Sequence, residues 1–157
     1  NMAIRFDLYY ISPDNKAHRP VVIHSDPIGS KARICGVNIE HFAGAFPTWL
    51  SPEQVRVLPI SDKSAAYAEE VLAALKAIGV RATADLGADR IQGKVKVAAE
   101  MKIPYLLVVG PRDAENRAVS VRARGIEKDL GAMPLDEFVR QIGEEIGTKR
   151  ATLGVKP

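Results

Sequence analysis

Cysteine is almost absent from this chain of 157 residues, since Cys35 is the only one. A single thiol excludes an internal disulfide framework and any metal site built from cysteine alone. Long apolar runs are missing as well, because the longest, residues 103–110, is far shorter than the roughly 20 residues that a membrane-spanning helix needs. We therefore expect no membrane anchor. Residues 1–20 carry charges and contain no continuous apolar segment, so we expect no secretory leader. The single cysteine favours a reducing, cytoplasmic location.

The usual signatures of a self-contained nucleotide-dependent enzyme are also missing. The sequence contains neither a GxGxxG nor a GxxxxGK[ST] phosphate loop, and no Ser/His/Asp or Cys/His set stands in a recognised motif. Hydrophobic residues make up 46% of the chain and charged residues 26%, which is typical of a globular protein and excludes a disordered or collagen-like one. The length allows one ordinary domain, or one domain plus a piece of another.

Charge is distributed unevenly along the chain. Residues 1–53 contain five basic and five acidic residues, so the whole net charge of +3 lies in residues 54–157. Within residues 90–128, nine basic residues stand against four acidic ones. Such a local excess can attract a polyanion such as RNA, whereas an ordinary solvated basic face is the alternative. Charge alone leaves both interpretations open.

The aromatic residues mark a division at the same place, since six of the nine precede residue 54. Pro47 and Pro52 bracket the segment PTWLSP, and this pattern predicts an extended, non-helical connector. We therefore predict a first segment over residues 1–46, a linker over 47–53 and a domain over 54–157.

Hydrophobic spacing in residues 54–157 predicts an α/β fold. Short apolar runs predict strands, and the 3.6-residue period predicts helices. The expected strands cover 55–60, 80–86, 105–109 and 118–123, and the expected helices run from Asp62 to Gly79, over 91–101 and from Leu135 onward. This order predicts three α/β/α layers around a mixed, mostly parallel sheet of about five strands, with residues 105–109 in the centre.

Residues 1–46 predict a β-hairpin followed by a helix. The expected strands cover 4–11 and 20–24 around a turn at 13–16, and the helix covers 29–43, beginning near Ser30. Two strands and one helix do not form a stable domain by themselves. This part is therefore interpreted as the end of something larger.

Three segments share one family likeness: HRPVVIH (18–24), IGS…R (28–33) and IEHFAGAFPTWLSPEQVRVLPISD (39–62). They resemble the threonyl-tRNA synthetases, which are class II aminoacyl-tRNA synthetases, and YA…L…GV (67–80), ADL (84–86), KIPYLLVVG (102–110) and VSVRAR (119–124) extend the resemblance over nearly the whole chain. The resemblance implies that residues 1–46 are the end of a catalytic domain with the third class II motif, and that 54–157 form an anticodon-binding domain. It further implies a tRNA partner and a homodimeric parent that attaches threonine to tRNA with ATP and zinc.

The same resemblance assigns two residues of the first segment to catalysis. Arg33 stands where the family's third motif carries the arginine that pairs with ATP, and His24 stands where the family has one of three zinc ligands. The two other ligands are absent here, and a zinc site needs three or four protein donors. We therefore expect no cofactor and no catalysis from this chain alone, and a solvated helix arginine is the alternative for Arg33.

For the second segment, the resemblance implies that Asp113 and Arg122 read anticodon bases. Its basic residues are expected to attract the phosphate backbone, and these are Arg90, Lys94, Lys96 and Arg124. The family's third base reader, an asparagine, is replaced by Ala88, which offers no side-chain donor or acceptor.

The motif around Arg33 also departs from the family pattern, at Ser25, Ala32, Ile34 and Asn38. Two hypotheses therefore remain: a tRNA-binding module of a threonyl-tRNA synthetase or a relative, or a catalytically inactive paralogue with a regulatory or protein-binding role. The connector and the excess of basic residues favour the first hypothesis, and the departures from the motif favour the second.

Overall fold

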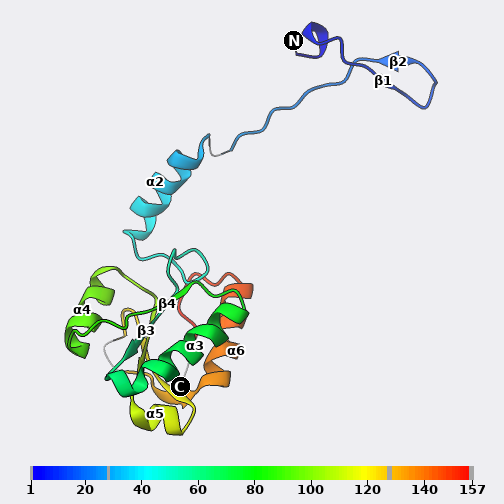
Figure 1. Ribbon diagram of the computed structural model, residues 1–157. Helices are drawn as coiled ribbons and strands as arrows, with labels where there is room; N and C mark the ends of the chain where they lie inside the picture. The colour runs from blue at the N-terminus through cyan, green and yellow to red at the C-terminus, as the bar shows by residue number, and fades with distance from the viewer. Residues whose placement is uncertain (1, 28, 127–128, 156–157) are drawn as a thin grey trace. The chain divides into compact units, whose positions relative to one another are not determined.

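The computed structural model describes residues 2–27, 29–126 and 129–155 (Figure 1). It divides into two compact units, Asn1–Gly36 and Val37–Pro157. None of the helices in these described ranges is long and apolar enough to cross a membrane.

The first unit contains a short hairpin. Its elements are α1 (Met2–Arg5), β1 (Tyr10–Ile11) and β2 (Ala17–His18), and Tyr10 lies opposite His18 in an antiparallel pair. The predicted turn at 13–16 is confirmed, because the Ser12 amide donates a hydrogen bond to the Lys16 carbonyl at 3.1 Å. The strand predicted over 4–11 is wrong in its first half, which begins as a helix. The strand predicted over 20–24 is also wrong, because the ladder ends at His18, two residues before Pro20, which has no amide hydrogen to donate.

The predicted helix over 29–43 is confirmed as α2 (Lys31–Phe42). It begins after Ser30, whose Oγ accepts a hydrogen bond from the Arg33 amide at 3.2 Å, as a helix N-cap does. At its other end the chain turns through Gly44, which has φ +76° and donates its amide to the Ile39 carbonyl at 3.1 Å. Local capping therefore sets both ends of this helix.

The second unit alternates strands and helices. Its elements are β3 (Val55–Pro59), the 3-10 turn η1 (Asp62–Ser64), α3 (Ala65–Ala77), β4 (Ala82–Ala84), α4 (Ile91–Glu100), β5 (Tyr105–Val109), α5 (Pro111–Glu115), β6 (Ala118–Ala123), β7 (Gly131–Pro134) and α6 (Leu135–Gly147). All the predicted strands and helices of this part are present, whereas α5 and β7 were not predicted. Asp62 begins the 3-10 turn and does not cap α3, which starts after Ser64. Gly79, with φ +79°, follows the end of α3 as predicted.

The strands form one mixed sheet in the order β4-β3-β5-β6-β7. β3 is parallel to both β4 and β5, while β6 is antiparallel to both β5 and β7. Among these strands only β6 therefore runs against the others, and the prediction of a mostly parallel sheet of about five strands is confirmed. β5 lies in the centre, as its unbroken apolar sequence predicted.

Helices cover the two faces of the sheet unequally. The larger core lies on the face that carries α3 and α6, and it includes Val57, Leu107 and Phe138. The smaller core lies under α4 and contains Leu58, Ala98, Ile103 and Leu106. This arrangement is the predicted three-layer α/β/α fold, with a thinner layer on the α4 side.

The segment 47–53 belongs to the second unit and packs against its sheet. The amides of Leu50 and Ser51 both donate to the Pro47 carbonyl, so the segment forms a turn. Arg81 donates to the carbonyls of Trp49 and Ser51, which holds the turn against the sheet. The predicted absence of helix is confirmed, but the predicted extended conformation is wrong, and the compact unit extends beyond residues 54–157 toward the N-terminus.

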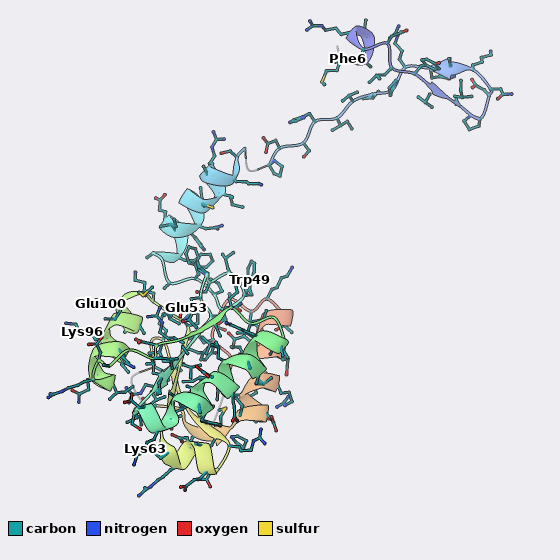
Figure 2. All side chains as sticks on the ribbon, viewed as in Figure 1. Phe6, Trp49, Glu53, Lys63, Lys96 and Glu100 are labelled. Atoms are coloured by element: carbon teal, nitrogen blue, oxygen red, sulfur yellow. The ribbon has the colours of Figure 1, made fainter. Side chains whose placement is uncertain are left out.

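Buried polar contacts fix this segment further. Gln54 is fully buried, and its side chain donates to the Thr48 carbonyl at 2.8 Å and accepts the Arg81 amide at 2.9 Å. Glu53 accepts two hydrogen bonds from Arg56, at 2.8 and 2.6 Å, and one from Thr83 Oγ1 (Glu53 is labelled in Figure 2). The turn therefore adds polar contacts to the edge of the sheet at β4.

Acid should remove part of this stability. Burial raises the pKa of Glu53, but the hydrogen bonds from Arg56 and Thr83 outweigh it, so the pKa lies below its ordinary value of 4.5. A lowered folded-state pKa gives stability that is present above pH 4.5 and is lost as the pH falls through the folded value. We expect Glu53→Gln to flatten the loss of unfolding free energy on acidification, measured by urea denaturation between about pH 7 and pH 3. Glu100→Gln is the control, and identical acid profiles for the two variants would contradict the prediction.

Candidate nucleic-acid interface

Strand alternation places Arg122 on the face of the sheet that carries α4. Val119, Val121 and Ala123 of β6 point into the larger core, so Ser120 and Arg122 point to the opposite face. Arg122 lies opposite Leu106 of β5, which packs in the smaller core under α4. The Arg122 guanidinium therefore lies near apolar side chains of α4, such as Val95.

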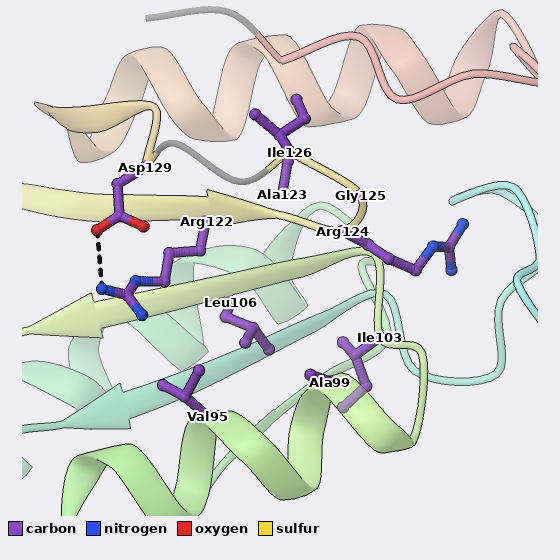
Figure 3. Close-up of a pocket in the computed structure, with 10 residues that line it drawn as sticks. All are labelled: Val95, Ala99, Ile103, Leu106, Arg122, Ala123, Arg124, Gly125, Ile126 and Asp129. Atoms are coloured by element: carbon purple, nitrogen blue, oxygen red, sulfur yellow. Dashed lines mark hydrogen bonds and ion pairs between the residues drawn. The ribbon is translucent and has the colours of Figure 1, made fainter.

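Two adjoining hollows lie along α4, and together we call them the α4 groove. One, of about 350 Å³, is drawn in Figure 3 and is lined by Val95, Ala99, Ile103, Leu106, Arg122, Ala123, Arg124, Gly125, Ile126 and Asp129. The other, of about 410 Å³, shares Val95 and Arg122 and is also lined by Ile60, Ile91, Gln92 and Val108. The groove therefore combines apolar walls with a guanidinium at the junction of its two halves.

An acid holds the guanidinium of Arg122. Arg122 Nη2 donates to Asp129 Oδ2 at 2.8 Å, and the two side chains are 43% and 52% exposed (Figure 3). Within the described part of the chain, this is the one hydrogen bond of the Arg122 side chain. A guanidinium carries five N–H donors, so most of them remain available to a ligand.

Asp113 lies in the first turn of α5, near Ser120 of β6. Its Oδ2 accepts the Gly110 amide at 2.8 Å, and its Oδ1 accepts a longer hydrogen bond from Ser120 Oγ at 3.4 Å. Ser120 and Arg122 are separated by one period of the strand alternation, so the two residues that the resemblance predicts as base readers meet the same face of β6. Both oxygens of Asp113 already serve the local structure.

The predicted phosphate-binding residues divide into two groups. Arg90 and Lys96 are exposed at the start and on the surface of α4, and their side chains make no hydrogen bond or ion pair with other described residues (Lys96 is labelled in Figure 2). Lys94 is different, since it is only 4% exposed and its Nζ donates to the Asp85 carbonyl at 2.7 Å. Lys94 is therefore not presented as a surface cation, and its buried amine anchors the loop after β4.

Arg124 is also occupied within the protein. Its guanidinium donates to the carbonyls of Lys102 at 2.5 Å, Ala45 at 3.1 Å and Phe46 at 2.7 Å. Burial lowers the pKa of Arg124 from its ordinary value. These bonds tie residues 45–46 to the end of β6, and the expected attraction of Arg124 for the phosphate backbone stays a prediction.

The two predicted catalytic residues lie in the first unit. His24 and Arg33 are exposed, and a Cβ at Gly29 would contact Arg33 Nη1. The described residues contain no group of three His, Cys, Asp or Glu side chains that could hold a metal ion. One imidazole does not fit a zinc ion, which needs at least three protein donors. The ATP role of Arg33 stays a prediction from the resemblance.

Asp129 was not predicted as a member of the site. This residue lies next to Arg122 because β6 and β7 are paired, with Val121 opposite Gly131. Since β7 was not predicted, the sequence did not indicate that the chain turns back along β6 and brings Asp129 close to Arg122. The position of an acid directly after a strongly basic stretch was the signal that could have found it.

Comparison with known proteins places these features in a family. A family model, the anticodon binding domain, matches residues 54–145. Threonine-tRNA ligase of Rhodopirellula baltica is 47% identical over 156 residues, covering 99% of this chain and 21% of the ligase. Threonine-tRNA ligase of Aquifex aeolicus is 46% identical over 149 residues, covering 95% of this chain and 23% of the ligase. The chain thus spans about a fifth of the length of these relatives.

Solved structures agree in fold. The RNA binding domain of threonyl-tRNA synthetase from Cryptosporidium parvum Iowa II superposes with a TM-score of 0.84 at 32% identity, covering 92% of this chain and 37% of that chain. A prolyl-tRNA synthetase from Cryptosporidium parvum gives a TM-score of 0.56 at 26% identity, covering 66% and 23%. The likeness seen in the sequence is confirmed, and since the family match covers more than half of the residues, this chain belongs to the anticodon-binding domain family, in the form found in threonyl-tRNA synthetases.

Proposed function

We propose that this chain is the anticodon-binding module of a threonyl-tRNA synthetase and that it holds the anticodon loop of threonine tRNA in the α4 groove. The observation that carries the proposal is the exposed Arg122 guanidinium between the apolar walls of that groove. The proposal for the longer protein is ATP-dependent attachment of threonine to its tRNA, by a cytoplasmic homodimer that uses zinc. The function of this chain needs neither ATP nor zinc.

The chemistry of the groove suits an unpaired base. Apolar side chains such as Val95 and Ile126 offer surfaces for a base, and a guanidinium can pair with two atoms of one base edge. Such a bidentate pair contributes about 1–3 kcal/mol of discrimination. Because Ala88 offers no side-chain hydrogen bond, more of the discrimination falls on Arg122.

Arg122 and Lys96 should therefore contribute differently. We expect Arg122→Ala to lower the preference for a threonine anticodon stem-loop over a scrambled loop by about tenfold, because a base contact is lost. Lys96→Ala should weaken binding of both RNAs by the same factor and reduce the salt slope by about one, because a phosphate contact is not selective. Fluorescence titrations of both stem-loops at two salt concentrations measure the two effects.

The wild-type titrations also test the function itself. If neither stem-loop binds more tightly than about micromolar at low salt, where electrostatic attraction is strongest, the tRNA-binding function is wrong. The alternative from the sequence, an inactive paralogue with a regulatory or protein-binding role, would then replace it.

A further inference from the structure

The ion pair between Arg122 and Asp129 joins two separate elements at the wall of the α4 groove. Arg122 lies on β6, and Asp129 lies in the connection that leads to β7 (Figure 3). The 2.8 Å contact joins Nη2 to Oδ2, and both residues line the same hollow. The carboxylate therefore lies where a bound RNA would approach.

Stability does not explain this pair. Both side chains are about half exposed, and ion pairs between exposed groups contribute little to folding. General attraction for RNA does not explain it either, because a carboxylate beside an arginine repels phosphate and cancels the cation's charge. An acid at this position lowers non-specific affinity, so its benefit must be of another kind.

The contact with Asp129 can hold the Arg122 guanidinium in one orientation. An arginine side chain has many rotamers, and its planar guanidinium recognises a base edge only when the plane is held in one direction. The Asp129 contact occupies one donor of the guanidinium and leaves the others available. Holding the group before RNA binds also reduces the entropy lost on binding.

We infer that Asp129 is a positioning residue for anticodon recognition, which orients the Arg122 guanidinium toward a base and suppresses its attraction for phosphate. This inference rests on the proposed function of the α4 groove. It makes Asp129 a determinant of selectivity that acts through Arg122.

The test is Asp129→Asn in the full 157-residue chain. We expect binding of the scrambled loop to tighten by about twofold, because a repulsive charge is removed. We expect the preference for the threonine anticodon stem-loop to fall by about tenfold, because the guanidinium is no longer oriented. The scrambled loop then binds more tightly while the threonine stem-loop binds more weakly. A loss of folding would weaken the binding of both RNAs. Asp129→Glu, which restores the carboxylate, should recover part of the preference.

Two controls isolate the contribution of Asp129. Glu100→Gln removes an acid from α4 that has no partner among the described residues, and it should change the affinity of both RNAs equally (Glu100 is labelled in Figure 2). In an Arg122→Ala background, Asp129→Asn should change the preference no further, since its effect passes through Arg122.

The outcomes are distinguishable. If the wild-type chain prefers the threonine stem-loop and Asp129→Asn keeps that preference, the positioning role is wrong while the proposed function stands. If the wild-type chain binds neither RNA, both are wrong.

Discussion

Phe138→Ala should lower the free energy of unfolding by about 3–5 kcal/mol, the usual cost of removing a buried phenyl ring. Phe138 lies on α6, is fully buried, and its ring meets that of Tyr105 edge-on, with centroids 5.9 Å apart. The ring therefore joins α6 to the central strand β5, and its loss leaves a cavity under the helix. Urea denaturation followed by circular dichroism measures the change.

A matched control is Val97→Ala on α4, where the side chain is 51% exposed. Surface truncations of this kind usually change stability by less than about 0.5 kcal/mol. A loss below about 1.5 kcal/mol for Phe138→Ala would contradict the tight packing of this core, because a ring in a collapsible site costs less.

The elements that the sequence predicted well are those whose side chains build the core. β5 is apolar on both faces, and α6 carries Leu135, Phe138 and Ile142 at helical spacing, so composition and period point to the observed structure. α5 and β7 were missed because other forces define them. α5 is a single short helix set by Pro111 and the Asp113 cap, and β7 is held by backbone pairing to β6, with few buried side chains.

The first unit shows the opposite error. Residues 20–24 have the β-branched sequence of a strand, but Val21 and Ile23 are 88% and 85% exposed and no described strand pairs with them. Strand propensity expresses packing against neighbours, so a sequence pattern alone does not create a strand. The same limit explains why the first half of the strand predicted over 4–11 is wrong.

The roles of the basic residues were predicted from residue type and family position, which do not reveal what each side chain contacts in the folded protein. Arg122 lies on the face that carries α4, because successive side chains of a strand point to opposite faces, but the sequence analysis did not predict this face. Lys94 and Arg124 were predicted as phosphate contacts, yet their partners are carbonyl oxygens of Asp85, Ala45 and Phe46. These partners come from distant parts of the fold, and no local pattern identifies them.

A buried polar cluster fastens the C-terminal residues to the central strand. Tyr105 donates its hydroxyl hydrogen to Glu145 Oε2 at 2.7 Å, and the same hydroxyl oxygen accepts the amides of Gly154 at 3.0 Å and Val155 at 3.2 Å. Burial raises the pKa of Tyr105 well above its ordinary value, so the hydroxyl stays protonated and can donate. One hydroxyl thus connects β5, α6 and the segment that follows α6.

Tyr105→Phe should therefore lower the free energy of unfolding by about 3 kcal/mol, although it removes a single oxygen atom. Glu145 is only 2% exposed, and one of its carboxylate oxygens already has no hydrogen-bond partner among the described residues. Loss of the tyrosine donor leaves this buried acid with fewer partners, which costs more than the loss of a neutral hydrogen bond. Urea denaturation measures the change.

Tyr67→Phe is the matched control, because the Tyr67 hydroxyl makes one hydrogen bond within the described ranges, to the Ala118 carbonyl at 2.9 Å. Its removal should cost about 1 kcal/mol, the typical contribution of a single neutral hydrogen bond. Amide hydrogen exchange at Val155 should accelerate in Tyr105→Phe and stay unchanged in Tyr67→Phe, because the Val155 amide donates to the Tyr105 hydroxyl. The Gly154 amide also donates to Glu145 Oε2, at 2.8 Å, and keeps this acceptor in the variant. Equal destabilisation by the two variants, with the exchange rate of Val155 unaffected, would show that the Tyr105 hydroxyl does not hold the C-terminal segment.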